Sequence, residues 1–303
     1  MLSPEAASSL ELDVTEILKP LLGRVSTIYT LLKISSNSES EFQQDEAFDT
    51  FASGYGTRDG IVGIMESALR WRGSVAVQEF CAAGIPLLLV ELLSHNSLIF
   101  SLRIKRRHIP VWLSPIGVVW AISSLRQLLF GGTSTFRHIL IRRDSVKVLS
   151  TLVEEDRLKL IKSWIGPGGG IQGVRDIINA VIDLLAFPFV AAQNFSTAPT
   201  PCNSVSSGSL PNMASSSVRL LTVDKEMMKG IEEDMGKYLM LLTEVDVPSI
   251  ILRCIDYLES KELGKPVAFL AKMAGYKPLA HQLVAKGLLD PNIITRLLDC
   301  SCS

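Results

Sequence analysis

The sequence lacks the cysteine pairs and the excess of one charge that mark several classes of protein. Its 303 residues hold five cysteines, an odd number that does not indicate a disulfide framework, so a reducing compartment such as the cytoplasm is expected. The formal net charge of −1 excludes a polyanion binder that acts through bulk charge. A hydrophobic content of 47% excludes a wholly disordered chain.

Signals for membranes and secretion are also missing. The first residues have neither the basic nor the apolar region of a signal peptide. The two most apolar stretches, residues 109–122 and 177–192, are interrupted before they reach the length of a membrane span. We therefore interpret both as buried helices, and no membrane span is expected.

Motifs of the common enzyme classes are absent too. The sequence has no His-Arg-Asp, Asp-Phe-Gly or Gly-x-Ser-x-Gly motif. The run GPGGGIQGVRD (residues 166–176) matches a dinucleotide-binding spacing, but a helical pattern precedes it where that motif requires a strand. A phosphate-binding P-loop is excluded as well, because no Lys-Ser/Thr follows the glycines. We interpret this run as a loop between helices, and we expect no catalytic residue, no cofactor and no small-molecule substrate.

A metal site is not expected either. Cys300 and Cys302 form a CxC pair, but His281 is isolated upstream, and a zinc site needs four ligands at defined spacing. Cys81 and Cys254 fall on apolar stripes, where cysteine acts as a small buried residue.

Helical patterns dominate what is present. Runs of alternating strand-forming residues are few, whereas apolar residues recur at intervals of three and four along much of the chain. Four stretches align as a helix end, a short turn and a new helix: residues 80–93, 140–153, 242–255 and 283–298. Their turn residues are Gly84, Asp144, Asp246 and Gly287.

The spacing of these stretches predicts an all-α fold of the armadillo/HEAT-like α-solenoid type. The last two begin 41 residues apart, within the 40–47 residue period of such repeats. The intervals of 60 and 102 residues fit one and two repeats with insertions, and residues 174–187 would hold the unmarked repeat. One helix pair cannot bury its apolar face alone, so neighbouring repeats stack.

Composition divides the chain into five parts. N-terminal helices (1–33) precede an acidic polar linker (34–60), and helical repeats follow (61–193). A Ser/Pro-rich insertion (194–217) has too little apolar surface to offset its ordering entropy and is predicted to be disordered. Further repeats (218–303) end partway through a repeat.

The charge is unevenly distributed. Residues 1–60 hold ten acids and four bases, whereas residues 103–147 hold nine bases and one acid, a net of +8. If the repeats stack regularly, two basic clusters of this segment fall near one edge. This candidate partner-binding edge consists of Arg103, Lys105, Arg106, Arg107, Arg137, Arg142 and Arg143. The alternative is that these cations solvate a loop or pair with the acidic linker.

Two runs resemble the C-terminal helical-repeat region of plant Fused-type serine/threonine kinases, the TWO-IN-ONE proteins. They are GYGTRDGIVGIMESAL (residues 54–69) and IDYLESKELGKPVAFLAKMAGYKPLAHQLVAKGLLDPNIITRLLDCSC (residues 255–302). The resemblance covers roughly residues 50–303. It implies armadillo-like repeats behind an N-terminal kinase domain, a role in cytokinesis at the phragmoplast, and kinesin partners. The kinase motifs have no counterpart here, so no catalytic residue can be carried over.

These observations favour a non-catalytic protein-interaction scaffold, cytoplasmic and by resemblance associated with the cytoskeleton. One alternative is a regulatory part of a serine/threonine kinase whose activity resides elsewhere in a longer chain. Another is a microtubule- or nucleic-acid-binding module that uses residues 103–147. Nucleic acid is the weaker option, because no aromatic platform is interleaved with the bases.

Overall fold

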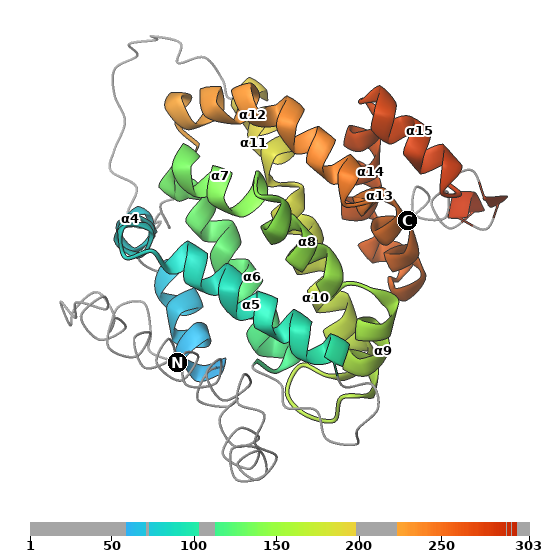
Figure 1. Ribbon diagram of the computed structural model, residues 1–303, viewed down its shortest axis with the longest axis horizontal. Helices are drawn as coiled ribbons and strands as arrows, with labels where there is room; N and C mark the ends of the chain where they lie inside the picture. Colours follow the sequence, from blue (N-terminus) through green and yellow to red (C-terminus); the bar gives the residue numbers. More distant parts are fainter. Residues whose placement is uncertain are drawn as a thin grey trace, which may run out of the picture.

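The computed structural model describes residues 59–70, 73–102, 113–197, 223–288, 290–291 and 293–295 (Figure 1). Residues 59–70 are helical, and the labelled helices follow: α4 (Ser74–Ala82), α5 (Ile85–Leu102), α6 (Pro115–Leu128), η2 (Leu129–Gly131), α7 (Thr133–Leu140), α8 (Arg143–Leu152), α9 (Glu155–Ser163), α10 (Gly170–Leu185), α11 (Phe187–Thr197), α12 (Lys225–Glu244), α13 (Val247–Cys254), η3 (Ile255–Tyr257), η4 (Ser260–Glu262), α14 (Gly264–Ala274) and α15 (Lys277–Ala285). No strand occurs within these ranges, which confirms the all-α prediction for them.

The predicted repeat stretches lie where one helix turns into the next. The first spans the α4–α5 junction, the second the α7–α8 junction and the third the α12–α13 junction. Gly84 and Asp246 have φ angles of 75° and 57°, and Gly287, after α15, has 98°. Left-handed backbone of this kind ends a helix and redirects the chain.

The predicted turn at Asp144 is wrong by two to three residues. Helix α7 ends at Leu140 and α8 begins at Arg143, so the turn lies at Ile141 and Arg142. Asp144 belongs to the first turn of α8, where its carboxylate is favoured by the positive end of the helix dipole.

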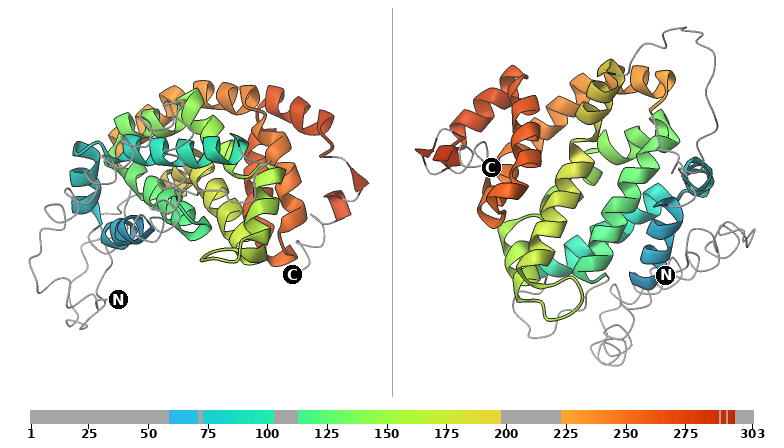
Figure 2. Two further views of the ribbon diagram at one scale, coloured as in Figure 1. Left: turned by 60° about the horizontal axis from the view of Figure 1, so that its bottom comes forward. Right: turned by 180° about the vertical axis from the view of Figure 1, so that it is seen from behind.

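The helices form two layers (Figures 1 and 2). One layer holds residues 59–70, α6, α10 and α14, in which α10 packs extensively on α6 and also touches α14. The Asp59 carboxylate accepts a hydrogen bond from the Ser114 backbone N–H (3.1 Å) and so joins residues 59–70 to the start of α6. The other layer holds α5, α7, α8 and α12, in which α5 packs on α8 and α12 on α7.

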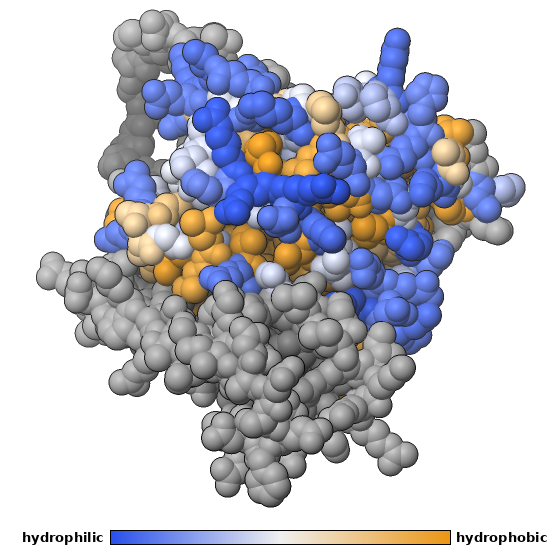
Figure 3. Space-filling model, viewed as in Figure 1, coloured by the Kyte–Doolittle hydropathy of each residue, from blue (hydrophilic) through white to orange (hydrophobic). Residues whose placement is uncertain are grey.

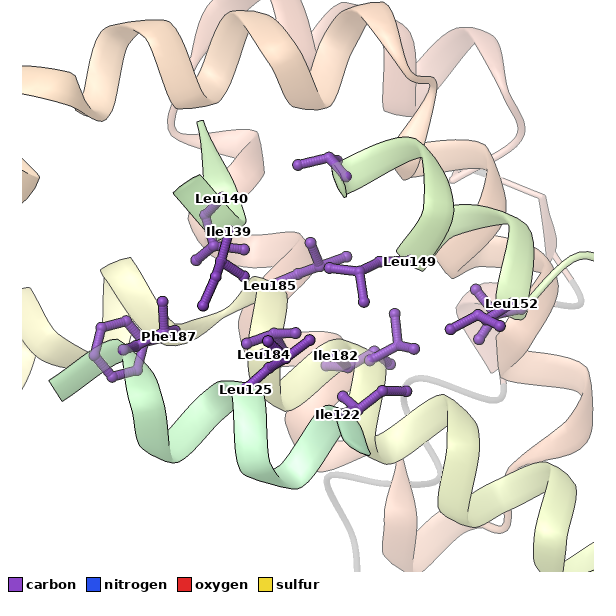
Figure 4. Close-up of a cluster of buried hydrophobic side chains, with 14 of the residues drawn as sticks. Ile122, Leu125, Ile139, Leu140, Leu149, Leu152, Ile182, Leu184, Leu185 and Phe187 are labelled. Carbon is purple, nitrogen blue, oxygen red and sulfur yellow. The ribbon is translucent and has the colours of Figure 1, made fainter. Parts of the chain in front are cut away.

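One continuous hydrophobic core lies between the layers (Figure 4). Leu125 of α6, Ile139 of α7, Leu149 of α8 and Leu185 of α10 converge there, and each is at most 2% exposed. These side chains come from helices whose apolar residues repeat at three- and four-residue intervals. The amphipathic pattern that predicted the helices therefore also selects the faces that pack.

Two described helices extend across predicted segment boundaries. Asp59 and Gly60, assigned to the linker, already belong to the first described helix, because the Asp59 side chain is buried against α6. At the predicted insertion, α11 continues to Thr197, and the rest of that insertion lies outside the described residues. Residues 174–187 are mostly the single helix α10, which ends at a turn before α11.

Most of residues 177–192 and the described part of residues 109–122 are buried helices, as predicted. Among the described helices, none alone is long and apolar enough to cross a membrane. Helix α4 and residues Ile85–Ser94 together reach the required length and apolar composition, but the two segments are bent by 73° relative to each other.

Candidate functional site

Residues 59–70, α6, α10 and α14 lie side by side in one layer (Figure 2). We call the outer side of this layer the third-helix face, because α6, α10 and α14 each follow a pair of helices joined by one of the predicted turns: α4–α5, α7–α8 and α12–α13. Its exposed or half-buried side chains include Ile64, Ser67, Trp120, Ser123, Gln127, Arg175, Asn179, Asp183, Ala268, Ala271 and Lys272. Apolar, amide and charged groups of both signs thus alternate across it.

A buried carboxylate organises one end of the third-helix face. Glu66 accepts hydrogen bonds from Arg70 (2.6 Å), Ser123 (3.1 Å) and Gln127 (3.4 Å). Its side chain is only 5% exposed, and a charge buried to that degree needs such partners. The network therefore holds α6 in register against residues 59–70.

Arg175 organises the other end. Its guanidinium pairs with Glu259, lies 3.5 Å from Glu262 and donates to the Tyr257 carbonyl (3.4 Å). Hydrogen bonds from Lys261 and Arg175 lower the pKa of Glu259. This group ties α10 to the segment that leads into α14.

The predicted basic edge is only partly placed by the structure. Arg103, Lys105, Arg106 and Arg107 lie outside the described residues. Arg142 and Arg143 are exposed at the start of α8. Arg137 donates from Nε to Asp234 of α12 at 2.5 Å and so contributes to an internal contact between α7 and α12.

Asp234 is the acceptor at the centre of that contact. Its side chain is 3% exposed, and Lys237 also donates to it at 2.8 Å. Hydrogen bonds from Lys237 and Arg137 lower the pKa of Asp234 below its ordinary value. The ionised carboxylate of Asp234 is therefore more stable in the folded protein than in the unfolded chain.

This contact predicts a pH dependence of stability. Because the folded-state pKa is lowered, the stabilisation is complete above the unfolded pKa and is lost as pH falls through the folded pKa. Urea unfolding midpoints between about pH 6 and about pH 2 should therefore fall more steeply in the unaltered protein than in Asp234→Asn. Asp144→Asn, which removes an exposed carboxylate, should follow the unaltered protein. Parallel slopes for the unaltered protein and Asp234→Asn would contradict the assignment.

Nothing in the described part of the chain resembles a reactive centre. Within it, no group of three or more His, Cys, Asp or Glu side chains could hold a metal ion. Burial raises the pKa of the Cys81 thiol and raises that of Cys254 to about 12, so neither thiol is activated. A cavity beside Leu113, Arg157 and Ile177 has about 20 Å³, room for about one water molecule.

The first four residues of the glycine-rich run (166–169) connect α9 to α10, as the sequence predicted, whereas its remaining residues from Gly170 onward already belong to α10. A Cβ on Gly168 would lie 2.4 Å from the Ile116 backbone nitrogen, and one on Gly173 would lie 1.7 Å from the Gly168 carbonyl oxygen. Gly168 also has a φ of 73°. These glycines allow the backbone of the loop to approach the start of α6.

Sequence reasoning missed the third-helix face. The signal was present in α10, where Arg175, Asn179 and Asp183 recur every four residues among mainly apolar residues. Such a polar stripe marks a solvent-facing side. That the stripe lies beside the exposed parts of α6 and α14 depends on packing.

Comparisons with known proteins identify a relative. The chain is 46% identical over 302 residues to the serine/threonine-protein kinase TIO of Arabidopsis thaliana. The match takes in 99% of this chain and 23% of that protein, so the chain spans less than a quarter of the relative's length. It confirms the resemblance to plant Fused-type kinases indicated by the two sequence runs. No protein-family model matches the chain, and no solved structure is significantly similar to it.

Proposed function

We propose that this chain is a non-catalytic protein-interaction region of the kind that accompanies a Fused-type serine/threonine kinase domain. The observation that carries the proposal is the recurrence of helix sets whose third members, α6, α10 and α14, pack side by side and each carry exposed or half-buried side chains. Repeats of this kind create extended binding surfaces from short units. The kinship to a much longer kinase supports a regulatory or scaffolding role.

The same proposal assigns the helix sets to armadillo-like repeats. Helices α4, α5 and α6 form one unit, α7, α8 and α10 a second, and α12, α13 and α14 a third. The helix of residues 59–70 would be the last helix of a preceding unit, and α15 would be the first helix of a following one. The sequence interval between the second and third units is then lengthened by the predicted insertion.

Resemblance extends the proposal to biological context. A role in plant cytokinesis, with a kinesin or another microtubule-associated protein as partner at the phragmoplast, is the setting in which such a region would act. The chain itself would contribute binding and no phosphoryl transfer, since it contains none of the kinase motifs.

The third-helix face can be tested by placing bulk and charge on it. Ala268→Arg with Ala271→Arg changes two exposed residues of α14. Affinity capture from dividing plant cells, read by quantitative mass spectrometry, should lose the specific partners at least about fivefold in this double variant. Glu232→Arg with Lys229→Arg, on the exposed side of α12, is the control and should retain them. Equal capture by all three proteins would exclude the third-helix face as the binding surface.

A further inference from the structure

We propose that a second surface, made by Arg142, Arg143 and Lys147 at the start of α8, binds an acidic peptide segment of a partner protein. We call these three residues the α8 cation cluster. It lies in the other helix layer, so this inference goes beyond the proposed role of the third-helix face. Figure 3 shows the most hydrophilic residues gathered over α7 and the start of α8.

The α8 cation cluster is exposed and is not neutralised by the described part of the chain. None of its three side chains forms an ion pair or hydrogen bond there. Many other cations of the described part are paired: Arg70 with Glu66, Arg137 with Asp234, Lys159 with Glu155, Lys265 with Asp183, and Lys286 with Asp246. Asp144 is the one acidic side chain in α8, which leaves a local excess of positive charge.

These cations also work against the helix that carries them. Arg142 occupies the N-cap position of α8, and its side chain makes no capping hydrogen bond. Arg143 follows at the first helical position, beside the positive end of the helix dipole. Arg143 and Lys147 are four residues apart, where like charges on a helix repel. A bound anionic group would relieve all three effects.

The equivalent junctions show that the fold does not require cations here. The α4–α5 junction uses Gly84 followed by Ile85 and Pro86 and carries no charge. At the α12–α13 junction, Asp246 accepts hydrogen bonds from Ser249 (2.7 Å), Gln282 (3.0 Å) and Lys286 (3.0 Å). The α4–α5 and α12–α13 junctions thus both change the direction of the chain without an unpaired cation at the turn. The cluster in α8 is therefore a local addition to a common design, of the kind expected at a functional surface.

The chemistry of the cluster fits carboxylates on a peptide better than a nucleic acid. Phe136, the one Phe, Tyr or Trp ring of α7 and α8, is fully buried and cannot stack on a base. A guanidinium group can hold a carboxylate through paired N–H donors, and the cluster offers two exposed guanidinium groups. An acidic peptide of several carboxylates would match this short cationic stretch.

The test is fluorescence anisotropy with the full chain and a labelled deca-glutamate peptide as the probe. Arg142→Glu with Arg143→Glu should weaken peptide binding at least about tenfold at low salt, and salt should weaken binding to the unaltered protein. Lys162→Glu with Lys277→Glu changes the net charge equally at two exposed cations outside the third-helix face that form no ion pair within the described part of the chain, and should change the affinity less than about threefold. Circular dichroism of both variants checks that the helices persist.

Three results would overturn the inference. Equal weakening in the two double variants would show an effect of net charge alone. Tighter binding of an oligothymidylate of the same charge would favour nucleic acid. A large gain in peptide affinity when the acids between residues 37 and 49 are replaced by amides would make this chain's own acidic segment the occupant. Each result leaves the test of the third-helix face unaffected, because that test uses residues of α14.

Discussion

Replacing Gly173 by alanine should lower the free energy of unfolding by at least about 3 kcal/mol. The added Cβ would lie 1.7 Å from the Gly168 carbonyl oxygen, within covalent distance, so the loop before α10 must move. That loop is packed against the Ile116 backbone at the start of α6. The displacement would therefore reach the packing of α10 on α6.

Urea unfolding followed by circular dichroism measures this effect, with Gly236→Ala as the matched control. Gly236 is an exposed residue inside α12, and a Cβ there would meet no atom within 4 Å. Alanine should stabilise that position by up to about 1 kcal/mol, because it restricts the unfolded chain and favours the helix. Opposite signs for the two substitutions are expected. A stabilised Gly173→Ala variant would show that the close approach of Gly168 and Gly173 is not present in solution.

The core prediction concerns Leu125. This residue is fully buried where α6, α7, α8 and α10 converge (Figure 4), so Leu125→Ala should cost about 3 kcal/mol through lost burial and a residual cavity. The control is Leu87→Ala on α5, where the side chain is 43% exposed. It should cost less than about 1 kcal/mol. The difference between the two unfolding midpoints in urea measures the effect, and similar losses would contradict a shared core at Leu125.

Much of the fold could be predicted because the relevant signals are local. Apolar residues at three- and four-residue spacing predicted helices, and the recurring junctions at Gly84 and Asp246 predicted where helices turn. The same logic failed at Asp144, because an acidic residue suits both a turn and the first turn of a helix. The exact start of α8 depends on the residues around Asp144, so the identity of Asp144 alone could not predict it.

The candidate sites were less predictable, because they join residues far apart in the chain. Arg137, Arg142 and Arg143 looked equivalent as part of one basic edge. Arg137, although also exposed, pairs with Asp234, a residue 97 positions away, whereas the other two have no partner in the described part of the chain. No local pattern distinguishes an arginine that closes a contact between helices from one that is available to a partner.

By itself, the sequence determined the helical class, the junction positions, the structural nature of the glycine-rich loop and the resemblance to a kinase family. Each of these depends on short-range spacing or on recognisable runs of residues. Only the tertiary structure decided that residues 59–70, α6, α10 and α14 share one face and that Glu66 and Asp234 are buried among partners. It also separated Arg137, which pairs with Asp234, from the α8 cation cluster, which has no ion pair within the described part of the chain. Burial and charge pairing arise from contacts between distant segments, and those contacts exist only once the helices have packed.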